Sequence, residues 1–293
     1  MNAPAVPVQV TASVLATQPV GAYTEMTLLA PGIAEVALPG QFVAVAVGGP
    51  ESPMLLRRSF AIAASGTHAS GSPAVGLVFA VAGRGTAWLA ERRVGETLDV
   101  VGPLGTPFPL PSAGGAVVLV GGGYGTAPLF PLADTLVAAG HDVHFVVGAG
   151  SADRLYGLDE ARGRGPVEVT TDDGSAGTPG RVTDVLPRVL GESGAATVYA
   201  CGPMGMLAAV TATAAARGAR AWVAVEESMA CGIGVCMTCV LPVVGDDGVT
   251  RMLRSCVAGP VFPGERVRFD AVGTVPPDAL GAPAVTAGAG GGH

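Results

Sequence analysis

Four cysteines near the end of the chain carry the strongest chemical signal. Cys231, Cys236 and Cys239 follow the spacing C-x4-C-x2-C, and Cys256 comes after sixteen intervening residues. This is the plant-type spacing for a [2Fe–2S] centre, whose irons are held by four thiolates. Glycines in the x4 loop let the backbone curl so that amide N–H groups point at the sulfurs, which tunes the reduction potential. The spacing therefore predicts a [2Fe–2S] cluster with these four ligands.

Two other interpretations of the cysteines are a structural zinc site and a set of unrelated thiols. Zinc sites usually show paired C-x2-C knuckles. Only one such pair is present, and the loop before it is rich in glycine. The iron–sulfur interpretation is favoured over both.

A glycine-rich turn, GGGYGTAP (121–128), lies between a predicted strand and a predicted helix. There the backbone can approach a pyrophosphate, which the helix N-terminus also attracts. The turn does not match G-x-G-x-x-G, and a purely structural turn would explain it about as well. A second strand end supports the ligand interpretation, because ligands bind at the carboxyl ends of strands in open α/β sheets. The nucleotide contacts predicted from both ends are Gly121, Gly122, Gly123, Gly125, Thr126, Cys201, Gly202 and Pro203.

A double arginine, Arg57-Arg58, stands at a predicted strand start in a chain that is poor in charge. A guanidinium is a bidentate donor for phosphate. The motif GRGT (83–86) leads into a short helix predicted at 86–92, with Thr86 as N-cap. Separately, a surface salt bridge and a plain turn would explain these features. Together they predict two phosphate receivers, which suit a dinucleotide such as FAD.

The elements that position these groups fall into segments of different pattern. Residues 7–111 read as short strands between Gly and Pro breaks, which predicts an antiparallel β-barrel or sandwich. Residues 114–226 alternate apolar strands with helical periods, which predicts a doubly wound α/β domain. Residues 227–270 are too short and too rich in Gly and Cys for a core of their own, and 273–293 resemble a flexible tail. The predicted class is a multidomain α+β protein.

Within the α/β domain, one helix is predicted from Leu129, Leu132, Leu136 and Val137, which recur at helical spacing and stop at Gly140. The strand that follows this helix ends without a clear acidic residue to select the nicotinamide cofactor, and Asp153 is the nearest candidate. Later turn residues Asp172 and Asp173 could contact a ligand or simply lie in a solvated turn.

Composition sets the outer bounds. The 293 residues suffice for about two domains, and 49% hydrophobic against 13% charged residues exclude general disorder. A net charge of −7 without basic runs argues against nucleic acid. The chain lacks a secretory pattern and a long apolar stretch, and its few cysteines are clustered. We therefore expect a cytoplasmic protein without a membrane span.

The motif order RRSF, GRGT, GGGYGTAP, TDDGSAG, CGPM and then the cysteines resembles the electron-transfer subunit of class 1B dihydroorotate dehydrogenase, within the ferredoxin-reductase-like group. The resemblance covers about residues 8–270. It implies an FAD-binding barrel, an NAD-binding α/β domain and a cluster-binding segment, with the four cysteines as cluster ligands.

The resemblance also places the flavin contacts. The family motif Arg-Pro-x-Ser falls on residues 58–61, where Ser replaces Pro and Ala61 replaces the final Ser. Arg58 would keep its phosphate role, whereas Ala61 offers only its backbone. The implied FAD contacts are Arg58, Ser59, Phe60, Ala61, Val78, Phe79, Ala80, Gly85 and Thr86.

The implied activity is electron transfer between NAD and a separate FMN-containing catalytic subunit. The overall reaction converts (S)-dihydroorotate and NAD⁺ to orotate and NADH, a step of pyrimidine (UMP) biosynthesis. The resemblance implies a heterotetramer of two chains of each kind, and no catalytic acid or base is expected here. Alternatives are the reductase subunit of a ferredoxin:NADP, sulfide dehydrogenase or hydrogenase complex. A further alternative, supported only by Ala61, is a metal-stabilised module without redox function.

Overall fold

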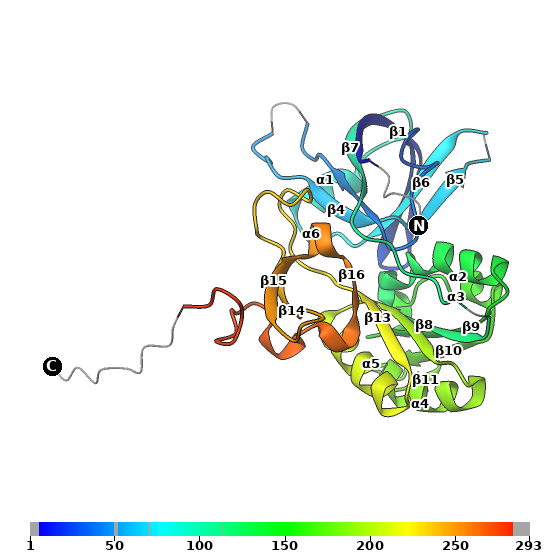
Figure 1. Ribbon diagram of the computed structural model, residues 1–293. Coiled ribbons are helices and arrows are strands. Elements are labelled where there is room, and N and C mark those ends of the chain that lie inside the picture. The colour runs from blue at the N-terminus through cyan, green and yellow to red at the C-terminus, as the bar shows by residue number, and fades with distance from the viewer. Residues whose placement is uncertain (1–5, 50–51, 70, 113, 284–293) are drawn as a thin grey trace.

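The computed structural model describes residues 6–49, 52–69, 71–112 and 114–283 (Figure 1). It has an N-terminal domain built on one sheet, an α/β domain built on a second, and a C-terminal segment that lies against both. Among the described residues, no helix is long and apolar enough to cross a bilayer.

The N-terminal domain is a seven-stranded sheet in the order β4-β3-β7-β1-β2-β6-β5, with antiparallel pairing throughout. Side chains alternate along β2, so that Met26 and Leu28 are buried in the domain core. No described strand closes the sheet between β4 and β5, so the predicted barrel is a half-barrel. The elements are β1 (Val8–Val20), β2 (Tyr23–Leu29), β3 (Phe42–Val45), β4 (Arg58–Ala61), β5 (Ala64–Thr67), β6 (Pro73–Phe79), α1 (Arg84–Ala90) and β7 (Thr97–Leu104).

The prediction that Thr86 is the N-cap of the short helix is wrong. Helix α1 begins at Arg84 and Gly83 holds the cap position. The Thr86 hydroxyl accepts the N–H groups of Ala82 at 2.9 Å and Gly83 at 3.1 Å. A side chain that reaches back from the third helical position satisfies free N–H groups as well as a cap would, so the helix starts two residues earlier than predicted.

The α/β domain has the sheet order β11-β10-β9-β8-β12-β13-β16, parallel except for β16. The prediction of a doubly wound parallel sheet is confirmed. Its strands are β8 (Ala116–Gly122), β9 (Asp142–Ala149), β10 (Val167–Thr171), β11 (Thr178–Pro179), β12 (Thr197–Cys201), β13 (Arg220–Ala224) and β16 (Val261–Pro263). Its helices and 3-10 turns are η1 (Gly123–Thr126), α2 (Leu129–Ala138), η2 (Ala152–Arg154), α3 (Leu158–Arg162), α4 (Val182–Ser193) and α5 (Met204–Ala216).

Both faces of this sheet are buried. Along β8, Val118 and Val120 pack with α4 and α5, whereas Val117 and Leu119 pack with α2. That explains why this strand is a continuous apolar run. The helix predicted from Leu129, Leu132, Leu136 and Val137 is α2, which buries the three leucines, whereas Val137 is 48% exposed.

The C-terminal segment has no separate core, as its length and composition predict. It contains β14 (Val240–Val244), β15 (Thr250–Arg254), α6 (Ser255–Ala258), η3 (Gly264–Arg266) and η4 (Phe269–Ala271), in addition to β16. Leu241, Val243 and Phe262 join the core of the α/β domain. The segment is thus held by burial against a neighbour.

The stretch predicted as a flexible tail is ordered over its first part. The N–H of Leu280 donates to the carbonyl of Thr250 at 2.8 Å, and Asp278 pairs with Arg268 at 2.9 Å. Ala279 is buried. The prediction is therefore wrong for 273–283, whereas 284–293 lie outside the described residues.

Candidate functional site

Two predicted strand ends meet at one place in the α/β sheet. Strands β8 and β12 are parallel neighbours, while the chain leaves β8 for β9 on the opposite side. Such a switch point forms a ligand crevice at the carboxyl ends of the strands. The glycine turn packs tightly here: a Cβ on Gly121 would lie 2.3 Å from the Thr126 hydroxyl, and one on Gly125 2.6 Å from the Cys201 carbonyl. Bare backbone is therefore required at both positions.

A first cavity of about 430 Å³ lies between the N-terminal domain and this switch point. Every predicted FAD contact except Gly85 lines it, together with Gly125 and Cys201. Gly85 lies beneath Arg58 instead, since a Cβ there would be 2.7 Å from the Arg58 Nε. Gly125 and Cys201, which were predicted as contacts of the NAD nucleotide, thus face this cavity instead.

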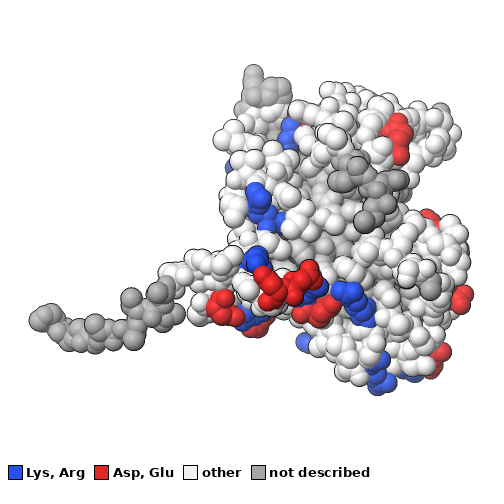
Figure 2. Space-filling model, in the orientation of Figure 1, with Lys and Arg blue, Asp and Glu red and all other residues white. Residues whose placement is uncertain are grey.

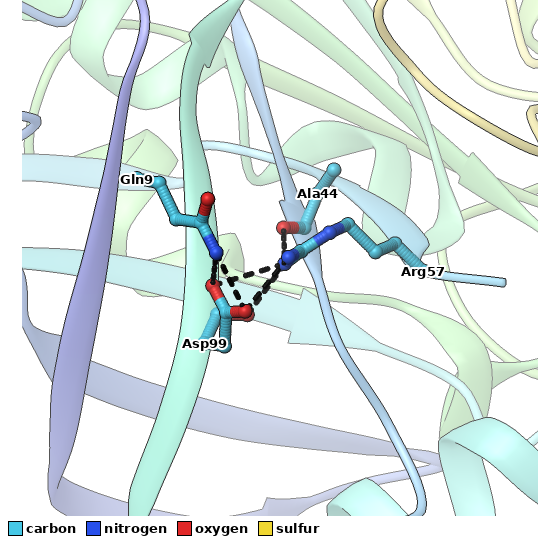
Figure 3. Close-up of polar contacts among 4 residues, drawn as sticks. All are labelled: Gln9, Ala44, Arg57 and Asp99. Carbon is cyan, nitrogen blue, oxygen red and sulfur yellow. Dashed lines mark hydrogen bonds and ion pairs between the residues drawn. The ribbon is translucent and has the colours of Figure 1, made fainter. Parts of the chain in front are cut away.

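The two adjacent arginines have different surroundings, and Figure 3 shows those of Arg57. The Arg57 guanidinium pairs with the Asp99 carboxylate at 2.8 Å and donates to the Asp99 carbonyl at 2.9 Å. Gln9 donates to the same carboxylate at 2.8 Å. Arg58 instead lines the first cavity. The salt-bridge interpretation therefore applies to Arg57, and only Arg58 is available for a phosphate.

The first cavity has the chemistry that a flavin dinucleotide needs. Arg58 supplies a cation for phosphate, and Phe60, Val78 and Phe79 supply apolar walls. The Thr86 hydroxyl also faces the cavity, but its proton goes to the Gly83 carbonyl at 3.0 Å. The hydroxyl oxygen also accepts the N–H groups of Ala82 and Gly83, so all of its hydrogen-bonding capacity is used within the chain. A contact with a phosphate oxygen would require it to turn.

A second cavity of about 570 Å³ opens at the carboxyl edge of the α/β sheet. Three of the predicted nucleotide contacts line it, namely Gly122, Gly123 and Pro203. Gly121, Thr126 and Gly202 line neither cavity and are buried behind it. They form the turn that presents the lining residues.

Three charged residues also line the second cavity: Arg154 and Arg181, which sequence reasoning missed, and Asp172, which it left open between a ligand contact and a solvated turn. Arg154 and Arg181 are cations suited to a pyrophosphate, and Asp172 is an acid suited to a ribose hydroxyl. Asp153 is not in the lining, and its carboxylate accepts the Ser151 hydroxyl. The acid at this site follows β10 rather than β9.

Tyr124 and Glu226 line both cavities, and sequence reasoning missed both. Glu226 is exposed to the cavities, but the protein around it partly desolvates its carboxylate, and this raises its pKa. A signal for it existed, because Glu226 comes just after β13, at the sheet edge that carries the other ligand groups.

The loop that carries the first three cysteines (231–239, called the cysteine loop below) curls around the Cys231 sulfur. The N–H groups of Val235 and Cys236 donate to this sulfur at 3.3 Å and 3.4 Å. Gly232 and Gly234 have φ of 71° and 82°, the left-handed conformation that glycine adopts without strain. The predicted function of the loop glycines, to aim amides at a thiolate, is therefore seen directly.

The four predicted cluster thiols fall into two pairs. Hydrogen bonds from Thr238 and then from Cys231 lower the pKa of the Cys236 thiol to about 6. Burial, followed by the Cys239 thiol, raises the pKa of Cys256 to about 12. In the described residues, no three His, Cys, Asp or Glu side chains are grouped as ligands of a single ion. Two thiol pairs suit a two-iron centre, where each iron takes two protein ligands.

The cysteine loop borders the first cavity. A Cβ on Gly232 would lie 3.5 Å from the Ser59 hydroxyl and 3.6 Å from the Phe42 ring, and both residues line that cavity. Phe42 also packs in one apolar cluster with Cys239 and Cys256. The thiols and the cavity therefore share a wall.

Two family descriptions match the chain. Residues 226–268 match the "Iron-sulfur cluster binding domain of dihydroorotate dehydrogenase B". Residues 119–212 match the "Oxidoreductase NAD-binding domain". Both matches fall on the parts of the chain for which cluster and dinucleotide binding were predicted.

A solved structure titled "Insights into flavin-based electron bifurcation via the NADH-dependent reduced ferredoxin-NADP oxidoreductase structure" is similar over 89% of this chain and 91% of that one, with 31% identity and a TM-score of 0.77. A "Ferredoxin reductase in carbazole 1,9a-dioxygenase" shares the fold, with 22% identity over 74% of this chain and 68% of that one and a TM-score of 0.62. The predicted cofactor set of FAD, a [2Fe–2S] cluster and NAD is confirmed by the two family matches together with the 31% identical oxidoreductase.

Curated relatives cover most of the chain. The "Dihydroorotate dehydrogenase B (NAD(+)), electron transfer subunit" of Bacillus caldolyticus is 40% identical over 81% of this chain and 90% of that protein. The protein of the same name from Shouchella clausii is 39% identical over 82% and 90%. The chain therefore belongs to the family of dihydroorotate dehydrogenase B electron-transfer subunits.

Proposed function

We propose that this chain moves electrons between NAD(H) and a separate FMN-containing dihydroorotate dehydrogenase subunit in the cytoplasm, within pyrimidine biosynthesis. The complex would contain two chains of each kind. The second cavity takes NAD(H), the first takes FAD, and Cys231, Cys236, Cys239 and Cys256 hold the cluster. When bound, FAD exchanges electron pairs with NAD(H) and single electrons with the cluster.

The shared wall between the first cavity and the cysteine loop carries this proposal. Phe42 and Ser59 face the cavity on one side and Gly232 on the other. A flavin in that cavity would thus lie one layer of side chains from the cluster. Electron transfer needs such proximity, and it needs no acid or base from the chain.

The residues of this chain bind and orient rather than react. Arg58 offers a guanidinium to a phosphate in the first cavity. Arg154 and Arg181 offer cations in the second, while Asp172 suits a free ribose hydroxyl better than a phosphate. This last contact favours NAD over NADP.

An exposed apolar rim beside the cysteine loop supports a permanent partner. The rim consists of Ile233 (54% exposed), Val235 (75%), Met237 (53%) and Val257 (49%), and Cys236 is exposed among them. Apolar groups that gather at one place mark interaction sites. In Figure 2 the charges of both signs lie mostly lower, over the C-terminal segment and the α/β domain.

The test is a set of anaerobic spectra of the purified chain with and without the catalytic subunit. We expect flavin and iron–sulfur absorbance, and reduction of both by NADH. With the catalytic subunit present, dihydroorotate should reduce the same centres and the two chains should co-purify. Material without iron and sulfide, or centres that dihydroorotate cannot reduce in the complex, would contradict the proposal.

A second candidate is the reductase subunit of a ferredoxin:NADP-type complex, favoured by the 31% identity to the bifurcating oxidoreductase. It has the same cofactors and a different partner. Co-purification with a ferredoxin-linked subunit, without response to dihydroorotate, would establish it.

A further inference from the structure

The first and second cavities meet at two side chains. Tyr124 and Glu226 are the residues that line both. Tyr124 comes from turn η1, and Glu226 follows β13. The two cavities therefore adjoin at these two residues.

Tyr124 is held in place from the N-terminal domain. Its ring meets the Tyr23 ring edge-on, with centroids 5.3 Å apart and an interplanar angle of 64°. The Tyr23 hydroxyl in turn donates to the Arg154 carbonyl at 2.8 Å. A Cβ on neighbouring Gly123 would lie 2.8 Å from that hydroxyl, so the turn is pressed against Tyr23. These contacts therefore hold the Tyr124 ring at the boundary of the two cavities in the resting protein.

The Tyr124 hydroxyl is a neutral phenol in this setting. Burial, and then the negative charge of Glu226, raise its pKa to about 12. The wall thus offers an uncharged aromatic face beside a carboxyl group. Both are compatible with a nicotinamide ring, which is flat and is cationic in its oxidised form.

Hydride transfer requires reacting atoms about 3–3.5 Å apart. Tyr124 lines both cavities, so its ring, held at their boundary, would keep a nicotinamide in the second cavity apart from a flavin in the first. The adenosine and pyrophosphate parts of the dinucleotide meet no such obstacle, because they lie toward Arg154 and Arg181. The obstacle therefore acts on one half of the ligand only.

We propose that Tyr124 is a positioning residue that forms a displaceable partition between the flavin and the dinucleotide cavities, so that the nicotinamide half binds only when the ring moves aside. This inference rests on the proposed function of the two cavities. Part of the nicotinamide binding energy is then used to break the Tyr23 contact. NAD⁺ should consequently bind the resting protein little better than ADP-ribose, which lacks only the nicotinamide.

The experiment measures the dissociation constants of NAD⁺ and ADP-ribose by titration calorimetry on the FAD- and cluster-loaded protein. Wild type and Tyr124→Phe, which keeps the ring, should bind the two ligands within about threefold of each other. Tyr124→Ala and Tyr124→Leu remove the ring and should tighten NAD⁺ about tenfold while ADP-ribose stays within about twofold. The leucine variant keeps most of the side-chain volume in case the alanine variant fails to fold.

The ratio of the NAD⁺ and ADP-ribose dissociation constants distinguishes a Tyr124 partition from a Tyr124 that only stabilises the fold. An unchanged ratio in both ring-free variants, or an equal change for both ligands, would overturn the proposal. So would weaker binding of NAD⁺ alone. A wild-type protein that binds neither ligand would refute the proposed dinucleotide cavity, and the partition with it.

Discussion

At the scale of single residues, the adjacent side chains of Arg57 and Arg58 have different roles. Arg57 is bound to Asp99 through both its carboxylate and its carbonyl, which ties the start of β4 to β7 (Figure 3). Arg58 is left to face the first cavity. The pair is 25% and 42% exposed, so its ionic contribution is modest, while its geometry fixes the backbone from which Arg58 extends.

Replacement of Arg57 should therefore weaken both the domain and its flavin. We expect Arg57→Ala to lower the free energy of unfolding by about 1–2 kcal/mol, the value of a few charge-assisted hydrogen bonds at a half-exposed site. FAD should dissociate more readily, because Arg58 loses its anchor. Urea unfolding and FAD retention on gel filtration measure these effects. Arg93→Ala, at an exposed arginine of the same domain, should change stability by less than about 0.5 kcal/mol.

The cluster ligands give a second prediction at this scale. Cys236→Ser should remove most of the iron and inorganic sulfide, since one iron would lose half of its protein ligands. Cys201→Ala should keep both at the wild-type level, because Cys201 lies at the first cavity rather than in the cysteine loop. Metal and sulfide analysis of anaerobically purified protein compares the two. Full iron in Cys236→Ser would remove this residue from the ligand set.

Functional residues that stand in a chemical motif can be predicted from a sequence. Residues whose role depends on how two domains pack cannot. The thiols, the turn glycines and Arg58 stand in recognisable motifs. Tyr124 stands inside the GGGYGTAP turn and Glu226 just after a strand, but their place where the two cavities adjoin depends on how two domains pack. The sequence also does not tell which of Arg57 and Arg58 pairs with Asp99 and which lines the first cavity.

At the scale of elements, the turn after β8 depends on the absence of a side chain. A Cβ on Gly121 would collide with Thr126, so Gly121→Ala should push η1 away from the strand. We expect at least about tenfold weaker ADP-ribose binding and lower stability. Gly191→Ala, inside helix α4 with nothing within 4 Å of its new Cβ, should instead stabilise the protein by about 0.5–1 kcal/mol and leave binding unchanged. Thermal unfolding and calorimetry measure both variants, and equal binding in the two would contradict this role for Gly121.

Element types followed the hydrophobic period well, because strands and helices have periods that local sequence reveals. Helix α2 begins at Leu129, the first residue of its predicted helical spacing. The reversal of β16 beside β13 was not predictable, because a three-residue strand carries no period and its pairing is non-local. The start of α1 was misplaced for a similar reason: Thr86 can satisfy N–H groups from either of two positions.

At the scale of the whole molecule, the C-terminal segment joins the two domains. Its strand β16 extends the α/β sheet, and the N–H of Thr106 in the N-terminal domain donates to the Gly259 carbonyl at 2.6 Å. In Figure 1 the segment lies beside both domains. The cysteines are thereby held against the first cavity while Cys236 faces outward. The second cavity, the first cavity and the cysteine loop thus follow one another, and the cysteine loop is exposed at Cys236.

The apolar rim should then determine the partner without affecting the cofactors. The double change Val235→Glu and Val257→Glu places two charges where an uncharged surface would be buried, so we expect affinity for the catalytic subunit to fall at least about tenfold. FAD, iron and NADH-driven flavin reduction should stay at wild-type levels. Val94→Glu, at a valine that is 66% exposed in the N-terminal domain away from the rim, is the matched control and should bind normally. Surface plasmon resonance with the immobilised catalytic subunit measures the difference, and wild-type affinity in the double variant would move the interface elsewhere.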